Sequence, residues 1–247
     1  MNQPAKARFA PLKNVTALMT LVNRLQARTV DLPGFGVFHG PSGYGKTKAG
    51  IYVCNRCNAP MVSIGDSWTR RKFLEHVLRE LGTVKPRGTV ADMTEQVIEQ
   101  LGEHIDRPLV IDEADKAVDK GWIELIRELH DYSQAPILLI GEEQLPTKLM
   151  RVERMHNRVL DWQPAQACDI EDARKLAMVY APQLRIDDAL LDHVRHQCKG
   201  VARRISTTLA EMGEFAMTSG LTSLDIGSYT GRIYTGEPTR RAGLRAA

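Results

Sequence analysis

Short apolar runs alternate with segments of helical periodicity through the first two thirds of the chain. The apolar runs, each a candidate strand, lie at residues 36–39, 61–64, 109–111 and 137–140. Between them, apolar side chains recur every three or four positions, which predicts helices at residues 46–58, 70–81, 93–104 and 122–132. Strands that alternate with helices predict an α/β fold, in which a parallel sheet is covered by helices on both faces.

The two ends of the chain follow other patterns. An amphipathic helix is predicted at residues 15–28, with Asn14 or Thr16 as its possible cap. Strand signals stop near residue 163, and helices are predicted at residues 169–180, 187–199 and 201–218. The last stretch mixes Gly, Ser, Thr and Arg with little apolar periodicity. We therefore predict an α/β domain at residues 1–163, a small helical domain at 164–220 and a flexible basic tail at 221–247.

The composition is that of an ordinary soluble protein. The chain has 247 residues, of which 43% are hydrophobic and 26% are charged, so it can bury a core and does not belong to the disordered or collagen-like classes. No apolar run approaches the length of a membrane span, and the N-terminal segment lacks the apolar core of a secretory signal. These features predict a cytoplasmic protein with no membrane partner.

Four cysteines are too few for a disulfide scaffold. Cys54 and Cys57 form a C-x-x-C pair within a predicted helix, where this spacing simply places both thiols on one face. Cys168 and Cys198 are isolated, so no second pair completes a zinc site. A structural or incidental role is the favoured interpretation, and metal or redox use is the alternative.

A glycine-rich octet follows the first predicted strand and opens the next helix. Residues 40–47 fit the pattern G-x-x-x-x-G-K-[ST], and this context argues against a mere turn with a surface lysine. Glycines let the backbone N–H groups surround a phosphate at the start of a helix. We expect Lys46 to reach the β- and γ-phosphates of ATP and the Thr47 hydroxyl to bind Mg²⁺. The candidate cofactor-binding residues are Gly40, Pro41, Ser42, Gly43, Tyr44, Gly45, Lys46, Thr47 and Lys48.

An acidic pair ends the third predicted strand. Open α/β sheets bind ligands at the C-terminal ends of their strands, and there the sequence continues with Asp112 and Glu113. Asp112 is placed to hold Mg²⁺ through water, and Glu113 to polarise the attacking water, which distinguishes hydrolysis from mere binding. Asp115 is a candidate for a further polar contact, but a solvated helix start is its favoured role. Beside the octet, the pair predicts catalysis rather than a simple cap.

With the octet, the acidic pair, a later strand and Gly200-Val-Ala-Arg203, the chain resembles the AAA+ ATPases over residues 10–220. The segments IDEADKA and ILLIGEEQL are most similar to the Mu B family of phage target-DNA activators, with its insertion-sequence helper ATPases. Members of that family bind ATP, polymerise on DNA and present target DNA to a transposase. Mu-type proteins also carry an N-terminal helix-turn-helix domain. Only about 35 residues precede the first predicted strand, so the chain resembles a short form.

The resemblance implies ATP and Mg²⁺ as cofactors, with largely sequence-independent double-stranded DNA and a transposase as partners. It also implies self-assembly into a helical filament or ring. A phage-encoded member would work in the cytoplasm of its bacterial host. The domain at residues 1–163 would then be the AAA+ nucleotide-binding domain, and the helical domain its lid.

The resemblance also implies roles for residues outside the octet. The strand at residues 137–141 corresponds to the sensor 1 strand, which lies beside the strand before the octet, and its polar tip falls at Glu142. An acidic residue there departs from the more common Asn, Thr or Ser. Arg203 corresponds to the sensor 2 arginine, which reaches the γ-phosphate from the lid, and Arg204 is the second choice.

A trans-acting arginine is implied in the stretch that follows the sensor 1 strand. Arg158 is the first choice for this arginine finger and Arg154 the second. Such an arginine, supplied by a neighbouring copy, stabilises the charge on the transferred phosphoryl group and accelerates hydrolysis by about 10³ to 10⁵. Surface arginines on a helix are the alternative interpretation.

The net charge of +3 is too small to indicate a nucleic-acid partner, so local clusters carry that argument. The candidate DNA contacts are Arg70, Arg71, Lys72, Lys116 and Lys120, which the resemblance places on loops lining a ring or spiral. A solvated face is as good an interpretation of each cluster alone. Trp68 lies beside the first cluster, and packing is the favoured interpretation of its role over base stacking. The tail arginines, which suit either DNA or a transposase, are Arg232, Arg240, Arg241 and Arg245.

The leading hypothesis from the sequence is an ATPase that assembles on double-stranded DNA and delivers target DNA to a transposase. A loader of a replicative helicase is one rival, and a secretion or signalling ATPase that does not bind DNA is another.

Overall fold

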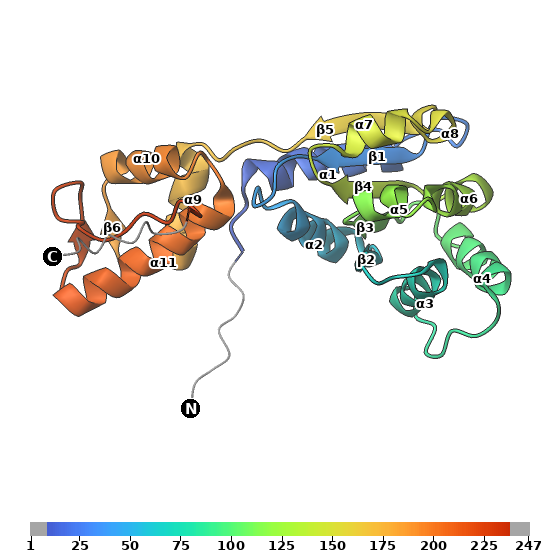
Figure 1. Cartoon of the computed structure of the whole chain (residues 1–247), viewed down its shortest axis with the longest axis horizontal. Helices are drawn as coiled ribbons and strands as arrows, with labels where there is room; N and C mark the ends of the chain where they lie inside the picture. Colours follow the sequence, from blue (N-terminus) through green and yellow to red (C-terminus); the bar gives the residue numbers. More distant parts are fainter. Residues whose placement is uncertain (1–8, 238–247) are drawn as a thin grey trace, which may run out of the picture. The chain divides into compact units, whose positions relative to one another are not determined.

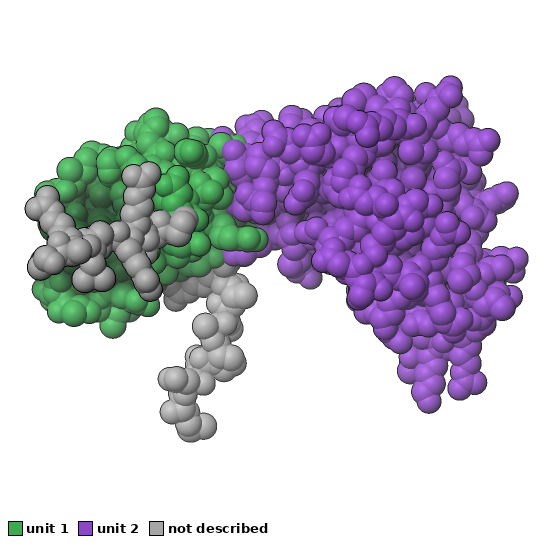
Figure 2. Space-filling model, viewed as in Figure 1, with its two compact units in different colours: residues 1–12, 167–247 green, residues 13–166 purple. Residues whose placement is uncertain are grey.

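The computed structural model describes residues 9–237. Within them the chain forms two compact units, coloured separately in Figure 2. The larger unit is Lys13–Gln166, and the smaller one consists of residues 167–237 together with the short segment 9–12.

A five-stranded parallel sheet forms the centre of the larger unit (Figure 1). The strands are β1 Phe35–His39, β2 Met61–Ser63, β3 Leu109–Asp112, β4 Ile137–Gly141 and β5 Val159–Pro164. Their order across the sheet is β2-β3-β4-β1-β5, so β4 lies directly beside β1. This adjacency confirms the arrangement expected for the strand at residues 137–141.

Eight helices accompany the sheet within this unit. They are α1 Lys13–Gln26, α2 Lys46–Cys57, α3 Arg70–Glu80, α4 Val90–Gly102, α5 Asp115–Asp119, α6 Ile123–Ser133, α7 Leu145–Met150 and α8 Glu153–His156. Thr69 and Thr89 cap α3 and α4 by accepting hydrogen bonds from the backbone three residues on. The predicted α/β fold with helices on both faces is confirmed.

Each face of the sheet has its own apolar layer. One face packs against α1 and α2 through Phe38, Val110, Leu138 and Ile140. The opposite face packs against the helices from α3 to α8 through Phe35, Val37, Leu109, Ile111, Ile137 and Leu139. Because both faces are covered, the central strands are apolar except at their C-terminal ends, which made them recognisable in the sequence.

The edge strand β5 was not predicted from the sequence. It reads Val-Leu-Asp-Trp-Gln-Pro and is only half-buried, so polar residues interrupt its apolar pattern. Asp161, for example, pairs with Arg24 on α1. The short helices α5, α7 and α8 were also missed, because four to six residues are too few to show a helical period.

The smaller unit is built from three helices and a two-stranded parallel ribbon. Its elements are α9 Ile170–Tyr180, β6 Arg185–Ile186, α10 Asp188–Gln197, α11 Ala202–Ser219 and β7 Ser223–Leu224. The helices share a core that includes Leu190, Val194, Ile205 and Leu209. All three helices agree with the sequence prediction.

Residues 221–237 differ from the predicted flexible tail. β7 pairs with β6, and Tyr229 and Ile233 pack against the helical core. The backbone N–H of Tyr234 donates to the Thr208 hydroxyl at 3.0 Å. Leu224, Tyr229 and Ile233 lie among Gly, Ser, Thr and Arg residues and form no sustained apolar pattern, which explains why the sequence did not reveal this packing. The rest of the predicted tail lies outside the described residues.

Among residues 9–237, no helix is both long enough and apolar enough to cross a membrane.

Gly141, the last residue of β4, tests how tightly the strand ends are packed. A Cβ at this position would lie 2.2 Å from Asp115 Oδ2 and 2.6 Å from Leu145 Cδ2. We expect Gly141→Ala to lower the free energy of unfolding by about 1–3 kcal/mol, measured by urea denaturation.

The matched control is Gly102→Ala, because the nearest atom to a Cβ there is Ser133 O at 3.8 Å. Ala in this helical position should keep or raise the free energy of unfolding, by at most about 1 kcal/mol. Equal stability of the two variants would contradict the close packing at Gly141.

Candidate nucleotide site

The loop between β1 and α2 has the backbone that a phosphate requires. Gly40, Gly43 and Gly45 have φ angles of 155°, 84° and 82°, a region that favours glycine. The N-cap of α2 is Gly45, which has no side chain to accept hydrogen bonds from the first N–H groups of the helix. Together with the positive end of the helix dipole, these N–H groups fit an anion.

The Lys46 ammonium lies inside this loop. Its Nζ donates to the carbonyl oxygens of Gly40 at 2.6 Å and Pro41 at 2.9 Å. Burial lowers the pKa of Lys46, and nearby carboxylates, led by Asp112 and Glu142, oppose that shift. The loop thus holds a cation beside the backbone groups that suit a phosphate.

Thr47 and Asp112 join the loop to β3. The Thr47 hydroxyl donates to Asp112 Oδ2 at 2.8 Å, and the backbone N–H of Glu113 donates to Asp112 Oδ1 at 3.0 Å. Asp112 is only 3% exposed, and burial raises the pKa of its carboxyl although the Thr47 hydrogen bond opposes this. A hydroxyl and a desolvated carboxylate side by side are oxygen ligands that fit Mg²⁺.

Glu113 has an unusual backbone. Its φ is 58°, in the left-handed region, which costs about 1–3 kcal/mol for a residue with a side chain. The carboxylate is partly exposed and pairs with Lys116 at 3.5 Å. Such strain is concentrated at functional sites, and it supports a catalytic interpretation of this residue.

Asp115 differs from its favoured interpretation as a solvated helix start. It is 5% exposed, and its Oδ2 accepts from the backbone N–H of Glu142 at 2.6 Å. The carboxylate therefore fixes the end of β4 beside the end of β3. The backbone N–H of Glu142 is thus bonded to Asp115, while the side chain of Glu142 is exposed. Its carboxylate lies close enough to Lys46 to raise the pKa of that ammonium.

Two further polar residues at this edge were missed by the sequence reasoning. Asn14, expected only as a possible cap, is buried within α1, and its Nδ2 donates to Tyr44 O at 2.9 Å and Gln166 O at 2.8 Å. Asn14 therefore anchors the glycine-rich loop to α1 through the Tyr44 carbonyl. His39 ends β1, and its Nδ1 is buried without a hydrogen-bond partner in the described part of the chain. Burial and the charge of Lys46 lower the pKa of His39, which favours the neutral form of the ring.

The sequence did contain a signal for His39, because it is a polar residue at the end of the strand that precedes the octet. Asn14 gave no such signal, because its partners are distant in sequence.

Arg158 lies at the N-terminal ends of the strands, opposite to the ends that carry the glycine-rich loop and the acidic pair. Phe35 N, at the start of β1, donates to Arg158 O at 3.0 Å, whereas the glycine-rich loop follows the end of β1. A strand of five residues separates these ends by about 13 Å. The structure therefore does not bring Arg158 to the loop of its own chain.

The other two candidate arginines are exposed. Arg154 lies on α8, near Arg158. Arg203 lies on α11 in the smaller unit, so its predicted reach to the γ-phosphate stays a prediction, as does the choice of Arg204.

The predicted DNA-binding residues lie around the β2–α3 loop. Arg70, Arg71 and Lys72 are exposed in the first turn of α3, and Arg71 also bonds Glu75 and the backbone of Gly88.

Lys116 and Lys120 secure this loop. Lys116 pairs with Asp66 at 3.2 Å, and Lys120 donates to Trp68 O at 3.2 Å. Trp68 stacks on His76 with ring centroids 4.2 Å apart, in agreement with a packing role.

Of the tail arginines, Arg232 is exposed, and Arg240, Arg241 and Arg245 lie outside the described residues.

The cysteine thiols are suited to structural roles. None of the four forms a disulfide, and Cys168 and Cys198 are buried. Burial raises the pKa of Cys54 to about 12, which disfavours the thiolate needed for metal or redox chemistry. Within residues 9–237, no group of three His, Cys, Asp or Glu side chains is placed to hold a metal ion.

The comparison with protein families matches residues 29–149 to the AAA domain. The match spans the glycine-rich loop, the acidic pair and β4. No curated protein matches the sequence.

Several solved structures share the fold. The ORC2 protein of Aeropyrum pernix, solved in ADPNP–ADP complexes, has 14% sequence identity and a TM-score of 0.62, with 91% of this chain and 67% of that chain covered. Cdc6p from Pyrobaculum aerophilum has 18% identity and a TM-score of 0.61, with coverage of 90% and 66%. The A. pernix ORC1 protein in complex with DNA has 15% identity and a TM-score of 0.62, with coverage of 87% and 62%.

The chain spans about two thirds of the length of these structures. None of these matches supports the narrower resemblance to the Mu B family. Residues 29–149 therefore match the AAA domain family, within a fold similar to that of the ORC2 and Cdc6p structures.

Proposed function

We propose that this protein binds ATP with Mg²⁺, hydrolyses it, and uses the bound state to assemble on double-stranded DNA. The observation that carries the proposal is the contact between Thr47 and Asp112 beside the enclosed Lys46. It places a hydroxyl, a desolvated carboxylate and an ammonium around one anion-binding loop.

Each of these residues has a defined task. The loop N–H groups and Lys46 would bind the phosphates, and Thr47 and Asp112 would hold Mg²⁺. When bound, MgATP supplies the phosphoanhydride bond and the charge that polarises it. Glu113 would orient a water molecule and accept its proton. Its backbone conformation and its pairing with Lys116 fix the carboxylate at the end of β3.

The arginine finger would come from a second copy of the chain. Arg158 and the glycine-rich loop lie at opposite ends of β1, so one chain does not supply both to the same phosphate. Assembly into a filament or ring would bring Arg158 of one copy to the nucleotide of the next. The resemblance to the AAA+ ATPases assigns Arg203 to the γ-phosphate.

The first turn of α3 supports a DNA contact. Arg70, Arg71 and Lys72 lie at the positive end of the helix dipole, and this turn has no acidic residue. A phosphate anion would offset that unfavourable concentration of positive charge. Lys116 and Lys120 would contribute by holding the loop before α3 and by adding charge.

A narrower proposal is that the DNA-bound assembly delivers target DNA to a transposase. It rests on the resemblance of the segments IDEADKA and ILLIGEEQL to the Mu B family. Capture of a purified transposase by the DNA-bound, ATP-loaded protein would support it. Capture of a replicative helicase instead would favour the loader hypothesis. Absence of DNA affinity in every nucleotide state would favour a secretion or signalling ATPase.

Lys46→Ala tests the nucleotide site directly. The variant loses the cation that neutralises the phosphates, so we expect loss of tight ATP binding and of ATP-dependent assembly. Calorimetric titration with ATP measures the affinity. Lys85→Ala, which removes an exposed lysine between α3 and α4, is the control for the loss of one positive charge away from the loop. Parent-like affinity in the Lys46 variant would overturn the nucleotide site.

Glu113→Gln separates binding from hydrolysis. The amide does not accept a proton from water, so the variant should bind ATP with parent affinity and hydrolyse it about 10² to 10⁴ times more slowly. Phosphate release measures turnover, and light scattering should show a persistent assembled state. If turnover is unchanged, Glu113 is not the base.

Replacement of Arg70, Arg71 and Lys72 together by Ala tests the DNA surface. Each lost phosphate contact should lower the slope of log affinity against log salt by about 0.9, while ATP affinity stays at the parent value. Fluorescence anisotropy with duplex DNA at several salt concentrations measures the slope.

The matched control is Arg79→Ala, at the exposed C-terminal end of the same helix. A thermal melt identifies loss of folding, since Arg70 and Arg71 also bond neighbouring loops. An unchanged slope and affinity in the triple variant would remove this cluster from the DNA surface.

A further inference from the structure

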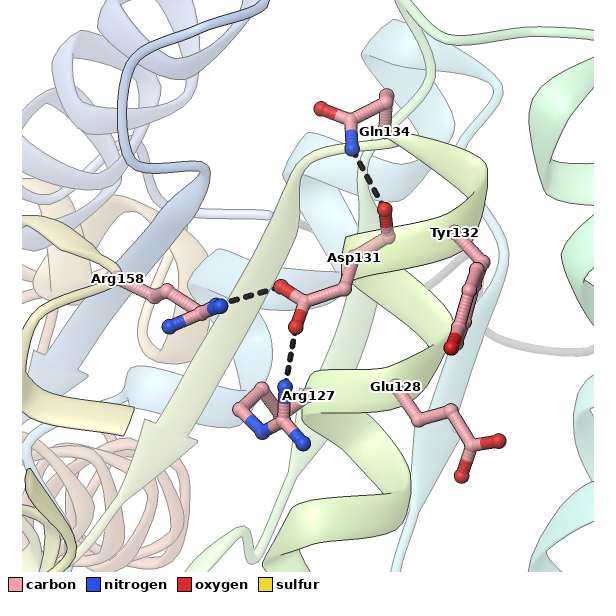
Figure 3. Close-up of a pocket in the computed structure, with 6 residues that line it drawn as sticks. All are labelled: Arg127, Glu128, Asp131, Tyr132, Gln134 and Arg158. Atoms are coloured by element: carbon pink, nitrogen blue, oxygen red, sulfur yellow. Dashed lines mark hydrogen bonds and ion pairs between the residues drawn. The ribbon is translucent and has the colours of Figure 1, made fainter. Parts of the chain in front are cut away.

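Asp131, near the C-terminal end of α6, bridges two arginines (Figure 3). Its Oδ1 accepts from Arg158 Nε at 2.5 Å, and its Oδ2 accepts from Arg127 Nη1. Arg127 is in turn held by Glu124 at 2.7 Å. One carboxylate therefore fixes Arg158 on one side and is itself fixed from the other.

This arrangement leaves one edge of the Arg158 guanidinium available. Nε is used by Asp131, and Nη1 donates to Arg154 O at 3.1 Å. Nη2 makes no hydrogen bond to any described residue of the chain. The Arg158 side chain is 35% exposed, so Nη2 is accessible to an acceptor group on another molecule.

The surface around the bridge is hollowed. A cavity of about 450 Å³ is lined by Arg127, Glu128, Asp131, Tyr132, Gln134 and Arg158. It lies at the C-terminal end of α6, which is capped by Gln134 just before β4 begins. The N-terminal ends of the strands are on this side of the sheet, whereas the glycine-rich loop follows a C-terminal end. Tyr132 is 72% exposed at its rim.

We propose that Asp131 is a positioning residue for Arg158, and that this cavity receives the nucleotide-bearing face of a second copy of the chain. The inference rests on the proposed ATPase function. Holding the guanidinium through Nε restricts its rotamers before the neighbour arrives, so Nη2 is already presented to the phosphoryl oxygens. The Asp131 charge also offsets the repulsion between Arg127 and Arg158.

Asp131→Asn keeps the shape of the side chain and removes its charge. We expect unchanged ATP affinity and a fall in turnover of about 10- to 100-fold, because misplacement of a positioned group by about 1 Å has an effect of this size. Asp161→Asn is the matched control, because Asp161 pairs with Arg24 and has a similar exposure of 24%, against 22% for Asp131. Its turnover should equal that of the parent.

Subunit mixing identifies the side of the interface at which Asp131 acts. Glu113→Gln subunits supply an intact Arg158 but do not hydrolyse ATP efficiently. Addition of these subunits to Asp131→Asn protein should raise turnover above that of either alone, since intact arginines then face intact nucleotide sites. Addition of Arg158→Ala subunits should not, because both variants lack a well-placed arginine.

The outcomes separate the inference from the proposed function on which it rests. Parent turnover in Asp131→Asn, or no recovery on mixing it with Glu113→Gln subunits, would overturn the positioning role. The mixture of Arg158→Ala with Glu113→Gln is the test of the finger itself. If that mixture also fails to recover activity, the trans-acting arginine of the proposed function is wrong.

Discussion

The hydrogen bond between Thr47 and Asp112 is the contact on which the organisation of this site depends. It joins the first turn of α2 to the end of β3, and so connects the glycine-rich loop with the acidic pair. Asp112 is almost fully buried, and burial disfavours its charge, so the carboxylate needs the hydroxyl and a nearby cation. Lys46 has the converse requirement, since its burial is compensated by the surrounding carboxylates. The supports at this edge, Asn14 under the loop and Asp115 at the end of β4, preserve these distances.

The parallel sheet imposes a second constraint. Because all five strands run in one direction, the loops after β1, β3 and β4 meet at one edge, while the segments before β1 and β5 meet at the other. Arg158 belongs to the second edge and the glycine-rich loop to the first. In the proposed site, Arg158 would therefore reach the phosphoryl group only from a neighbouring copy, and Asp131 would hold its guanidinium until that copy arrives. In this account, assembly and catalysis are two results of the same topology.

The parts of the structure that the sequence predicted are those with a local signal. The octet at residues 40–47 is recognisable by the spacing of its residues. The strands that precede the octet and the acidic pair are recognisable as apolar runs. The burial of Asp115 was not predictable in this way, because it depends on a partner 27 positions away, the backbone of Glu142. The bridge from Asp131 to Arg158 joins residues equally far apart, and Asn14 bonds Gln166 across nearly the whole larger unit. Such contacts are set by the packing of distant elements, which periodicity does not record.

The dependence of ATP turnover on protein concentration tests most directly the claim that the site is completed by a second copy. Turnover per chain should be measured over a dilution series with saturating ATP and Mg²⁺, in parallel with sedimentation to identify the assembled state. Turnover per chain should rise with concentration and reach a plateau once the chains are assembled. Constant turnover down to concentrations at which every chain is a monomer would contradict this claim.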